Sequence, residues 1–333
     1  MVSTQRAQTL DVLHAALPTL AELDALAGLS PDDRAALPVV DGRLAAPFAL
    51  DWQGDEVHSL RFEVYAESSP LSAIGARLYR LVLDQPACRH IQVLEIDEVA
   101  CTSDEAVSLL GDPIWLLARE GLPAMTRRLS LTRSGLVAHG GDLGYLPLGD
   151  LSPLAGRLGA VEHLHLTGVE RLGALALPRL HTLRLTSSVS TANLRELARL
   201  ELPALAHLEL SCDLFADPEL RFAGMRALLR SKGLPSLRRL VLDELDVDDD
   251  QHAELDEDGD DPPSWVEMIA RSPLLRQLES LSLTFSAEER EAPMLVELAD
   301  AFSHLRELEI TDAAGDRVTL VAPTAAAIAS ALE

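Results

Sequence analysis

The sequence predicts an α/β fold in which a parallel sheet is built from many repeats of a strand followed by a helix. A Leu-x-x-Leu-x-Leu phrase recurs along most of the chain, and helix-capping patterns lie between its copies. Hydrophobic residues make up 47% of the sequence but aromatic residues only 4%, so leucine fills the core. One strand–helix unit cannot bury its own leucines, and we therefore expect the repeats to stack into a solenoid.

The recurring phrase marks the strands. Its fourth and sixth positions are two residues apart and share one face of a strand, so these leucines point into the core. Positions three, five and seven are expected to point outward. Seven copies are clear and an eighth, at 126–131, is degenerate; the clear copies span residues 91–96, 161–166, 180–185, 205–210, 237–242, 278–283 and 305–310.

The sequence predicts that the chain is divided into two segments. Residues 1–56 are expected to be a helical N-terminal lead-in or cap, because leucines recur there at roughly helical spacing. Residues 57–333 are expected to be the solenoid, with a first, atypical strand at 57–62 and an acidic insertion at 243–261.

Capping residues and prolines mark the helix starts between the strands. A terminal helix starting near Pro323 is expected to cap the last repeat. The other expected starts are Ser69-Pro70, the capping box 102–105, Thr191, Asp217-Pro218, and the capping boxes 264–267 and 286–289.

The formal net charge of -25 argues against nucleic-acid binding, which needs a basic surface to displace counterions. It also disfavours an anionic membrane surface. It is compatible with a basic protein partner, and solubility alone is the simpler interpretation.

Missing sequence patterns lead to two further predictions, one on cellular location and one on enzymatic activity. Cys88, Cys101 and Cys212 are too few and too scattered for a disulfide framework, and the N-terminus lacks the pattern of a signal peptide. We therefore expect a cytoplasmic protein. The sequence contains no phosphate loop, dinucleotide fingerprint, nucleophile elbow or zinc-protease motif, so we expect no enzymatic activity and no cofactor.

From about residue 57 onward, the chain resembles bacterial leucine-rich-repeat proteins of the ribonuclease-inhibitor-like, strand-plus-helix type. Leu-Pro phrases at 177–178, 202–203 and 234–235 strengthen the resemblance. It implies a curved parallel sheet with helices on the convex side, used for protein binding. One departure concerns the ninth position, where the family has Asn or Cys; here this position holds Val99, Val169, Ser188, Asp213, Leu245, Ser286 and Ala313.

The outward strand positions supply the candidate binding residues. Five of these residues fall on three consecutive strands: His163, His165, Arg184, His207 and Glu209. This cluster has three possible interpretations: a polar recognition patch anchored by Arg184, a metal site made by His163 or His165 with His207 and Glu209, or an ordinary solvated face. A row of hydroxyl side chains at position seven is expected to hydrogen-bond across strands. The candidate partner-binding residues on the sheet are Arg128, His163, His165, Arg184, His207, Glu209 and Arg239.

The insertion at 243–261 holds 12 acidic residues and no Lys or Arg. It is expected to be either a solvated loop or a docking arm for a basic partner. A calcium loop fails because position twelve of the pattern is Trp265 instead of glutamate. The candidate contacts in this segment are Asp248, Asp249, Asp250, Asp256 and Asp258.

Three functional hypotheses follow. The first is a protein-interaction scaffold or adaptor that binds its partner through the sheet. The second is an immunity or inhibitor protein that occludes a basic toxin or enzyme. The third, from another class, is a metal- or ligand-binding sensor.

Overall fold

The structure is a computed structural model. It describes residues 4–18, 39–40, 43–44, 46–64, 70–98, 113–133, 136–139, 142–145, 148–186, 191–211, 218–243, 264–284, 288–311 and 316–332.

The chain divides into two compact units, residues 1–148 (unit 1) and 149–333 (unit 2). Each unit combines parallel strands with helices and is therefore mixed α/β. The boundary lies inside the segment 57–333 that the sequence analysis treats as one array, and the predicted division at residue 56 does not coincide with it.

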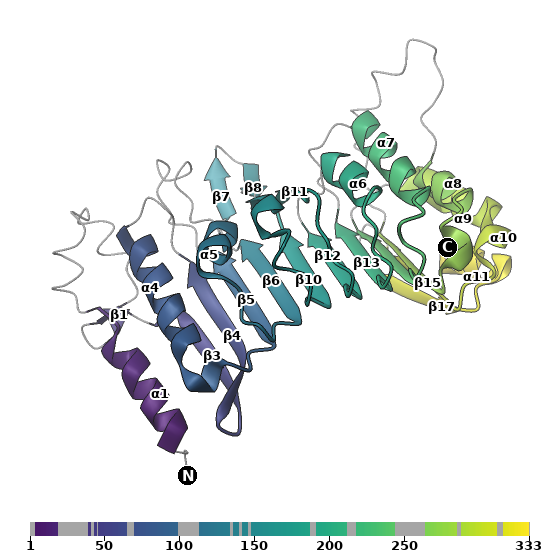
Figure 1. Cartoon of the computed structure of the whole chain (residues 1–333). Helices are drawn as coiled ribbons and strands as arrows, with labels where there is room; N and C mark the ends of the chain where they lie inside the picture. The colour runs from purple at the N-terminus through teal and green to yellow at the C-terminus, as the bar shows by residue number, and fades with distance from the viewer. Residues whose placement is uncertain are drawn as a thin grey trace. The chain divides into compact units, whose positions relative to one another are not determined.

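Unit 1 contains helices, a short 3-10 helix and strands that alternate along the chain (Figure 1). Its elements are α1 (Thr4–Ala15), β1 (Val39–Val40), β2 (Arg43–Leu44), β3 (Phe48–Gln53), β4 (Glu56–Val64), α4 (Pro70–Asp84), η1 (Pro86–Cys88), β5 (Val93–Glu98), α5 (Pro113–Glu120), β6 (Arg128–Arg133), β7 (Leu136–His139) and β8 (Asp142–Tyr145).

The main sheet of unit 1 has the strand order β3-β4-β5-β6. β4, β5 and β6 are parallel, whereas β3 runs antiparallel to β4. The segment 1–56, which the sequence predicts to be a helical lead-in, contains the helix α1 and also the strand β3. The physical reason is a hairpin: Gly54 has φ of 65°, which allows a two-residue turn, and β3 alternates between half-buried and exposed residues.

Unit 2 repeats the strand–helix pattern and closes with a small helix. Its elements are β9 (Gly149–Asp150), η3 (Ser152–Leu154), β10 (His163–Thr167), β11 (Val169–Arg171), β12 (Thr182–Thr186), α6 (Thr191–Leu197), β13 (His207–Ser211), α7 (Pro218–Leu229), β14 (Arg239–Asp243), α8 (Trp265–Ala270), η5 (Leu275–Gln277), β15 (Ser280–Thr284), α9 (Glu288–Glu297), α10 (Ala299–Phe302), β16 (Glu307–Thr311), β17 (Arg317–Val321) and α11 (Ala325–Ala331).

The sheet of unit 2 has the strand order β10-β12-β13-β14-β15-β16-β17, parallel except for the last pair. The phrase positions align from strand to strand, as the sequence predicts: Leu183 pairs with Leu208, and the same row continues through Leu240 and Leu281. These leucines are at most 1% exposed. Burial of apolar surface stabilises a fold by about 25 cal/mol per Å², so these rows stabilise the unit.

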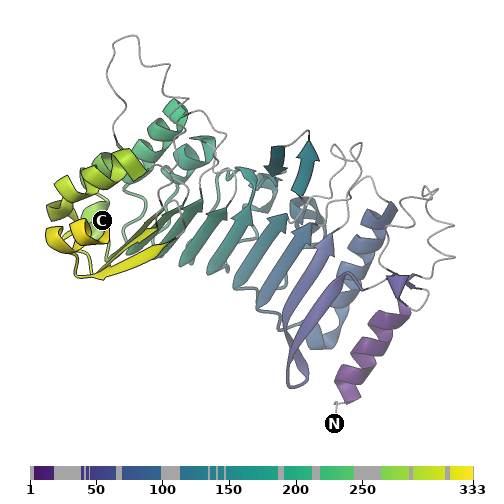
Figure 2. The same ribbon diagram turned by 180° about the vertical axis from the view of Figure 1, so that it is seen from behind.

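Helices α6, α7 and α8 lie on one side of the strands of unit 2 (Figure 1). Seen from behind, the strands of this unit carry no helix across them in the described residues (Figure 2). We call this second side the open face; it is defined by the side chains at positions 163, 165 and 167 of β10 and their register partners on β12 to β16.

Serine side chains link successive repeats on the helix side. Ser231 Oγ donates to the carbonyl oxygen of Ala198 at 2.9 Å, and Ser272 Oγ donates to that of Leu229 at 2.8 Å. Each hydroxyl also accepts from a backbone N–H two residues later. These bonds satisfy carbonyls at the ends of α6 and α7, which lack intrahelical donors.

A buried carboxylate caps α8. Glu291 on α9 accepts hydrogen bonds from Ser264 Oγ at 2.6 Å, from Trp265 N at 3.1 Å and from Val266 N at 3.0 Å. Ser264 is itself the N-cap that accepts from Glu267 N, as the capping box at 264–267 predicts. Negative charge at a helix N-terminus is favourable, so one side chain joins two helices.

The end of the chain adds one strand that the sequence analysis does not foresee. β17 pairs antiparallel with β16 and continues the sheet beyond the last leucine phrase. α11 follows, and its N-cap is Thr324, whose hydroxyl accepts from Ala327 N, not the predicted start at Pro323. Among the described residues, no helix has the length and apolar character needed to cross a membrane.

Candidate functional site

The open face brings the predicted sheet residues of unit 2 into adjacent rows. His165 on β10 pairs in register with Arg184 on β12, and Arg184 pairs with Glu209 on β13. His207 lies next to Arg239 of β14 in the neighbouring row. Parallel neighbours are about 4.8 Å apart, so long side chains on this face reach one another.

An ion pair lies at the centre of the open face. Arg184 Nε donates to Glu209 Oε1 at 2.8 Å, with the arginine side chain 49% exposed and the glutamate 18% exposed. Burial raises the pKa of Glu209, while the charges of Arg184 and Arg239 act in the opposite direction. The carboxylate thus holds the guanidinium in place and leaves half of its surface free to contact another molecule.

Two histidines on β10 hydrogen-bond to threonines on β12. His163 Nδ1 lies 3.1 Å from Thr182 Oγ1, and His165 Nε2 lies 3.2 Å from Thr186 Oγ1. Burial, reinforced by the charge of Arg184, lowers the pKa of His165 to about 4. This imidazole is therefore neutral at neutral pH.

His207 differs from the other two because its Nε2 atom is buried and has no hydrogen-bond partner among the described residues. Burial lowers the pKa of His207, and the charges of Arg239 and Arg184 lower it further. A neutral ring nitrogen left without a partner costs free energy unless another molecule supplies the bond.

The hydroxyl row at position seven is engaged within the sheet. Thr167 and Thr186 share a hydrogen bond of 2.9 Å, and Thr284 Oγ1 donates to Asp243 at 2.9 Å. These are the cross-strand bonds that the sequence analysis expects of this row. The row therefore stabilises the strands and offers few free groups.

The open face is not exposed along its whole length. Val241, Ser282 and Glu309 are buried, at 8%, 2% and 6% exposure. Ser282 donates to Glu309 at 2.6 Å, and Arg317 of β17 pairs with the same carboxylate at 2.9 Å. Long side chains and the added strand thus close the face over β14 to β16, while Arg239 at its rim stays exposed.

The remaining predicted residues belong to unit 1 or lie outside the described residues. Arg128 lies on β6 of unit 1, where it pairs in register with Val93. The acidic candidates Asp248, Asp249, Asp250, Asp256 and Asp258 lie outside the described residues.

Within the described ranges, no three or more His, Cys, Asp or Glu side chains are grouped so as to hold a metal ion. The metal interpretation of His163, His165, His207 and Glu209 thus has no support from this geometry. The sequence analysis also misses a basic groove on the helix side, lined by Arg226, Arg230 and Arg271. Its signal is two arginines at helical spacing in an acidic chain.

No protein-family model matches the chain, and no curated protein matches its sequence. Among solved structures, a protein from Bacteroides fragilis matches with a TM-score of 0.49 and 16% sequence identity, covering 74% of this chain and 67% of that one. A similarity this weak supports no inference about function.

Proposed function

We propose that the chain is a leucine-rich-repeat protein that binds another protein through the open face of β10, β12 and β13 and catalyses no reaction. The matched register of the leucine phrases supports the repeat assignment. The serine links at Ser231 and Ser272 add a hydrogen-bonded connection between successive repeats on the helix side.

The observation that carries the binding proposal is the half-exposed guanidinium of Arg184, held by Glu209 at 2.8 Å on a hydrogen-bonded sheet. Arginine is enriched among the residues that dominate interface energies. A side chain already fixed by a neighbour loses less conformational entropy on binding than a free one. Arg184 is therefore suited to anchor a partner.

The histidines complete a patch of neutral hydrogen-bonding groups around this charge. Because the pKa of His165 is lowered to about 4, its imidazole is a weak base at neutral pH. That argues against general-base catalysis on a neighbouring threonine, which works best when the pKa lies near the working pH.

Site-specific photo-crosslinking in native lysate tests the proposal. The photoreactive residue p-benzoylphenylalanine replaces exposed Arg239 at the rim of the open face or, as a control, exposed Arg195 on α6. We expect one protein adduct from position 239 and none from position 195. Equal adducts from both positions, or an adduct from position 195 alone, would place the partner elsewhere.

A further inference from the structure

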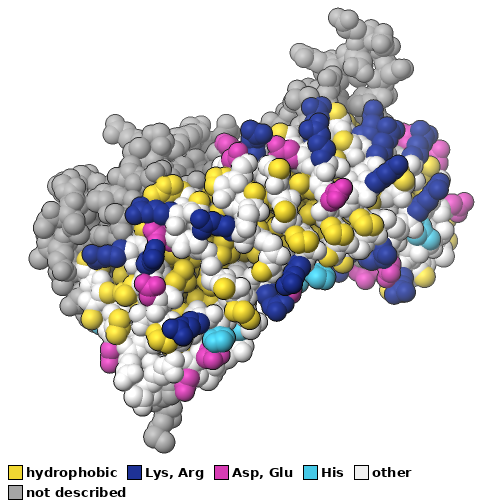
Figure 3. Space-filling model, in the orientation of Figure 1, with side chains coloured by type: hydrophobic (Ala, Val, Ile, Leu, Met, Phe, Trp, Pro, Cys, Tyr) yellow, Lys and Arg dark blue, Asp and Glu magenta, His cyan; other side chains and the backbone are white. Residues whose placement is uncertain are grey.

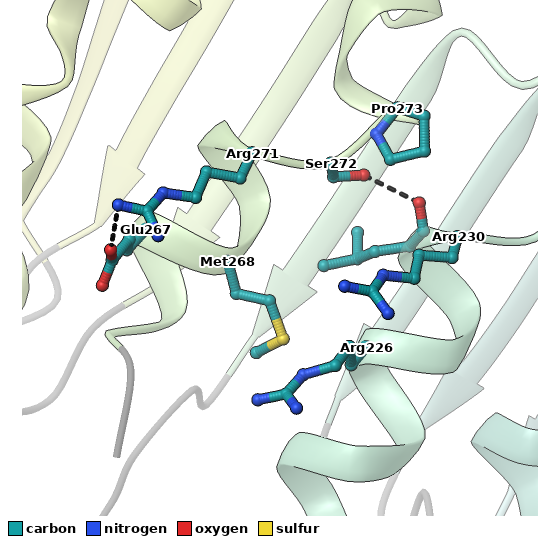
Figure 4. A pocket seen from close by; sticks show the side chains of 8 residues that line it. Arg226, Arg230, Glu267, Met268, Arg271, Ser272 and Pro273 are labelled. Atoms are coloured by element: carbon teal, nitrogen blue, oxygen red, sulfur yellow. Dashed lines mark hydrogen bonds and ion pairs between the residues drawn. The ribbon is translucent and has the colours of Figure 1, made fainter. Parts of the chain in front are cut away.

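A basic groove lies on the helix side of unit 2, between the end of α7 and the end of α8 (Figure 4). Lys and Arg side chains gather over this group of helices (Figure 3). This is unexpected in a chain with 53 acidic and 28 basic residues. The groove has a volume of about 200 Å³ and is lined by Arg226, Leu229, Arg230, Glu267, Met268, Arg271, Ser272 and Pro273.

Two of its arginines have no ion-pair partner among the described residues. Arg226 and Arg230 are four residues apart, so they project from the same side of α7, and both are exposed. Neither forms an ion pair within the described part of the chain, whereas Arg271 pairs with Glu267 at 2.6 Å. Like charges at this spacing mildly destabilise a helix, so an anion in the groove would relieve an existing repulsion.

The surface between the arginines is apolar. Leu229 is buried, Met268 is half-buried and its side chain lies between the two helices near Arg226, and Pro273 closes one end (Figure 4). The bond from Ser272 to the Leu229 carbonyl fixes the end of α8 against α7. The groove thus combines a flexible thioether floor with guanidinium groups at its edges.

We propose that this groove binds an acidic peptide segment of a partner protein, with one apolar side chain lying on Met268. Guanidinium groups recognise carboxylates through paired N–H donors, and here they come from two helices. Inorganic phosphate alone would leave the apolar floor uncovered.

The overall negative charge of the chain does not prevent this binding. At physiological salt the screening length is about 8 Å, so distant carboxylates contribute little within the groove. Three arginines and one glutamate line the groove, so its lining carries a net positive charge. The groove is on the helix side and is separate from the open face proposed above.

The test uses the full chain and a fluorescein-labelled pentapeptide with four carboxylate side chains around a central leucine, followed by fluorescence anisotropy. The variant Arg226→Gln with Arg230→Gln removes both free guanidinium groups. The matched control, Arg195→Gln with Arg199→Gln, removes the same charge at the same spacing from the neighbouring helix region, outside the groove. Thermal melting confirms that both variants fold.

We expect the groove variant to bind at least about tenfold more weakly and the control to stay within about twofold of the wild type. Replacing the central leucine by serine should also weaken binding. No binding at millimolar peptide in low salt, or equal losses in both variants, would overturn the proposal. If a variant lacking residues 246–258 binds the peptide but the wild-type chain does not, the chain's own acidic residues occupy the groove, and the proposal of a partner segment is overturned.

Discussion

Arg184 donates to Glu209 across β12 and β13 at 2.8 Å, and this pair sets the electrostatics of the open face. The charge of Arg184 lowers the pKa of both His165 and His207 and opposes the rise in the pKa of Glu209. Burial is the larger cause of the lowered pKa of both histidines, and the charge of Arg184 adds to it while its side chain stays half-exposed.

The first prediction concerns how the stability of the folded chain depends on pH. His165 has a pKa of about 4 in the folded chain, below the unfolded value of about 6.5. Between these values the unfolded chain binds more protons, so stability rises with pH. The stabilising contribution is complete above about pH 6.5 and is lost as the pH falls toward 4. Urea unfolding at several pH values should show a weaker dependence on pH in this window for His165→Gln.

The matched control is His181→Gln, because His181 is exposed. This variant should follow the wild type at each pH. Glu209 acts with the opposite sign, because its raised pKa makes its contribution decline as the pH rises. The difference in the free energy of unfolding between the wild type and His165→Gln at each pH gives the contribution of His165 alone. Identical pH profiles for these two proteins would refute the lowered pKa of His165.

The second prediction concerns the cap that joins α8 and α9. Glu291→Gln replaces a carboxylate oxygen by an NH₂ group that faces backbone donors, so we expect a loss of about 2–3 kcal/mol in the free energy of unfolding. Chemical denaturation measures it. Glu297→Gln, at an exposed position of the same helix, should change stability by less than about 0.5 kcal/mol. Equal effects would mean that the cap contributes nothing.

The third prediction concerns the serine links. Ser272→Ala removes the donor to the Leu229 carbonyl and the acceptor for Leu274 N, both buried, and should cost about 1–2 kcal/mol. The control is Ser303→Ala, which removes only an exposed local bond to Asp300. Denaturation midpoints compare the two, and a Ser272 variant as stable as the control would contradict the role of the links.

The fourth prediction concerns close backbone packing. A Cβ at Gly233 would collide with the carbonyl oxygen of Leu200, whereas a Cβ at Gly159 would meet nothing within 4 Å. Gly233→Ala should therefore destabilise by about 1–3 kcal/mol. Gly159→Ala should be neutral or slightly stabilising, since it reduces the freedom of the unfolded chain. Thermal melting distinguishes the two, and matching shifts would be inconsistent with this contact.

The strand register is predictable because the leucine phrase has a period of two, which assigns Leu183 and Leu208 to one buried row. The antiparallel strands β3 and β17 are missed because neither contains the phrase. β3 alternates only weakly, and four of the five residues of β17 are exposed.

The candidate site is predictable only in part. Alternation places Arg184 and Glu209 side by side, but it cannot show that Ser282 and Glu309 are covered by neighbouring side chains. The links made by Ser231 and Ser272 have a sequence signal, because each serine lies six residues before a leucine phrase. The groove of Arg226 and Arg230 depends on how α7 packs near α8, which periodicity does not specify.

The most direct test of the proposed function is the affinity of the crosslinked partner for the double variant Arg184→Glu with Glu209→Arg, measured by calorimetry. The exchange preserves an ion pair and should leave the melting temperature unchanged, but it reverses the charge presented on the open face. We predict at least about a tenfold loss of affinity, equivalent to about 1.4 kcal/mol. Unchanged affinity in a fully folded variant would contradict binding through this face.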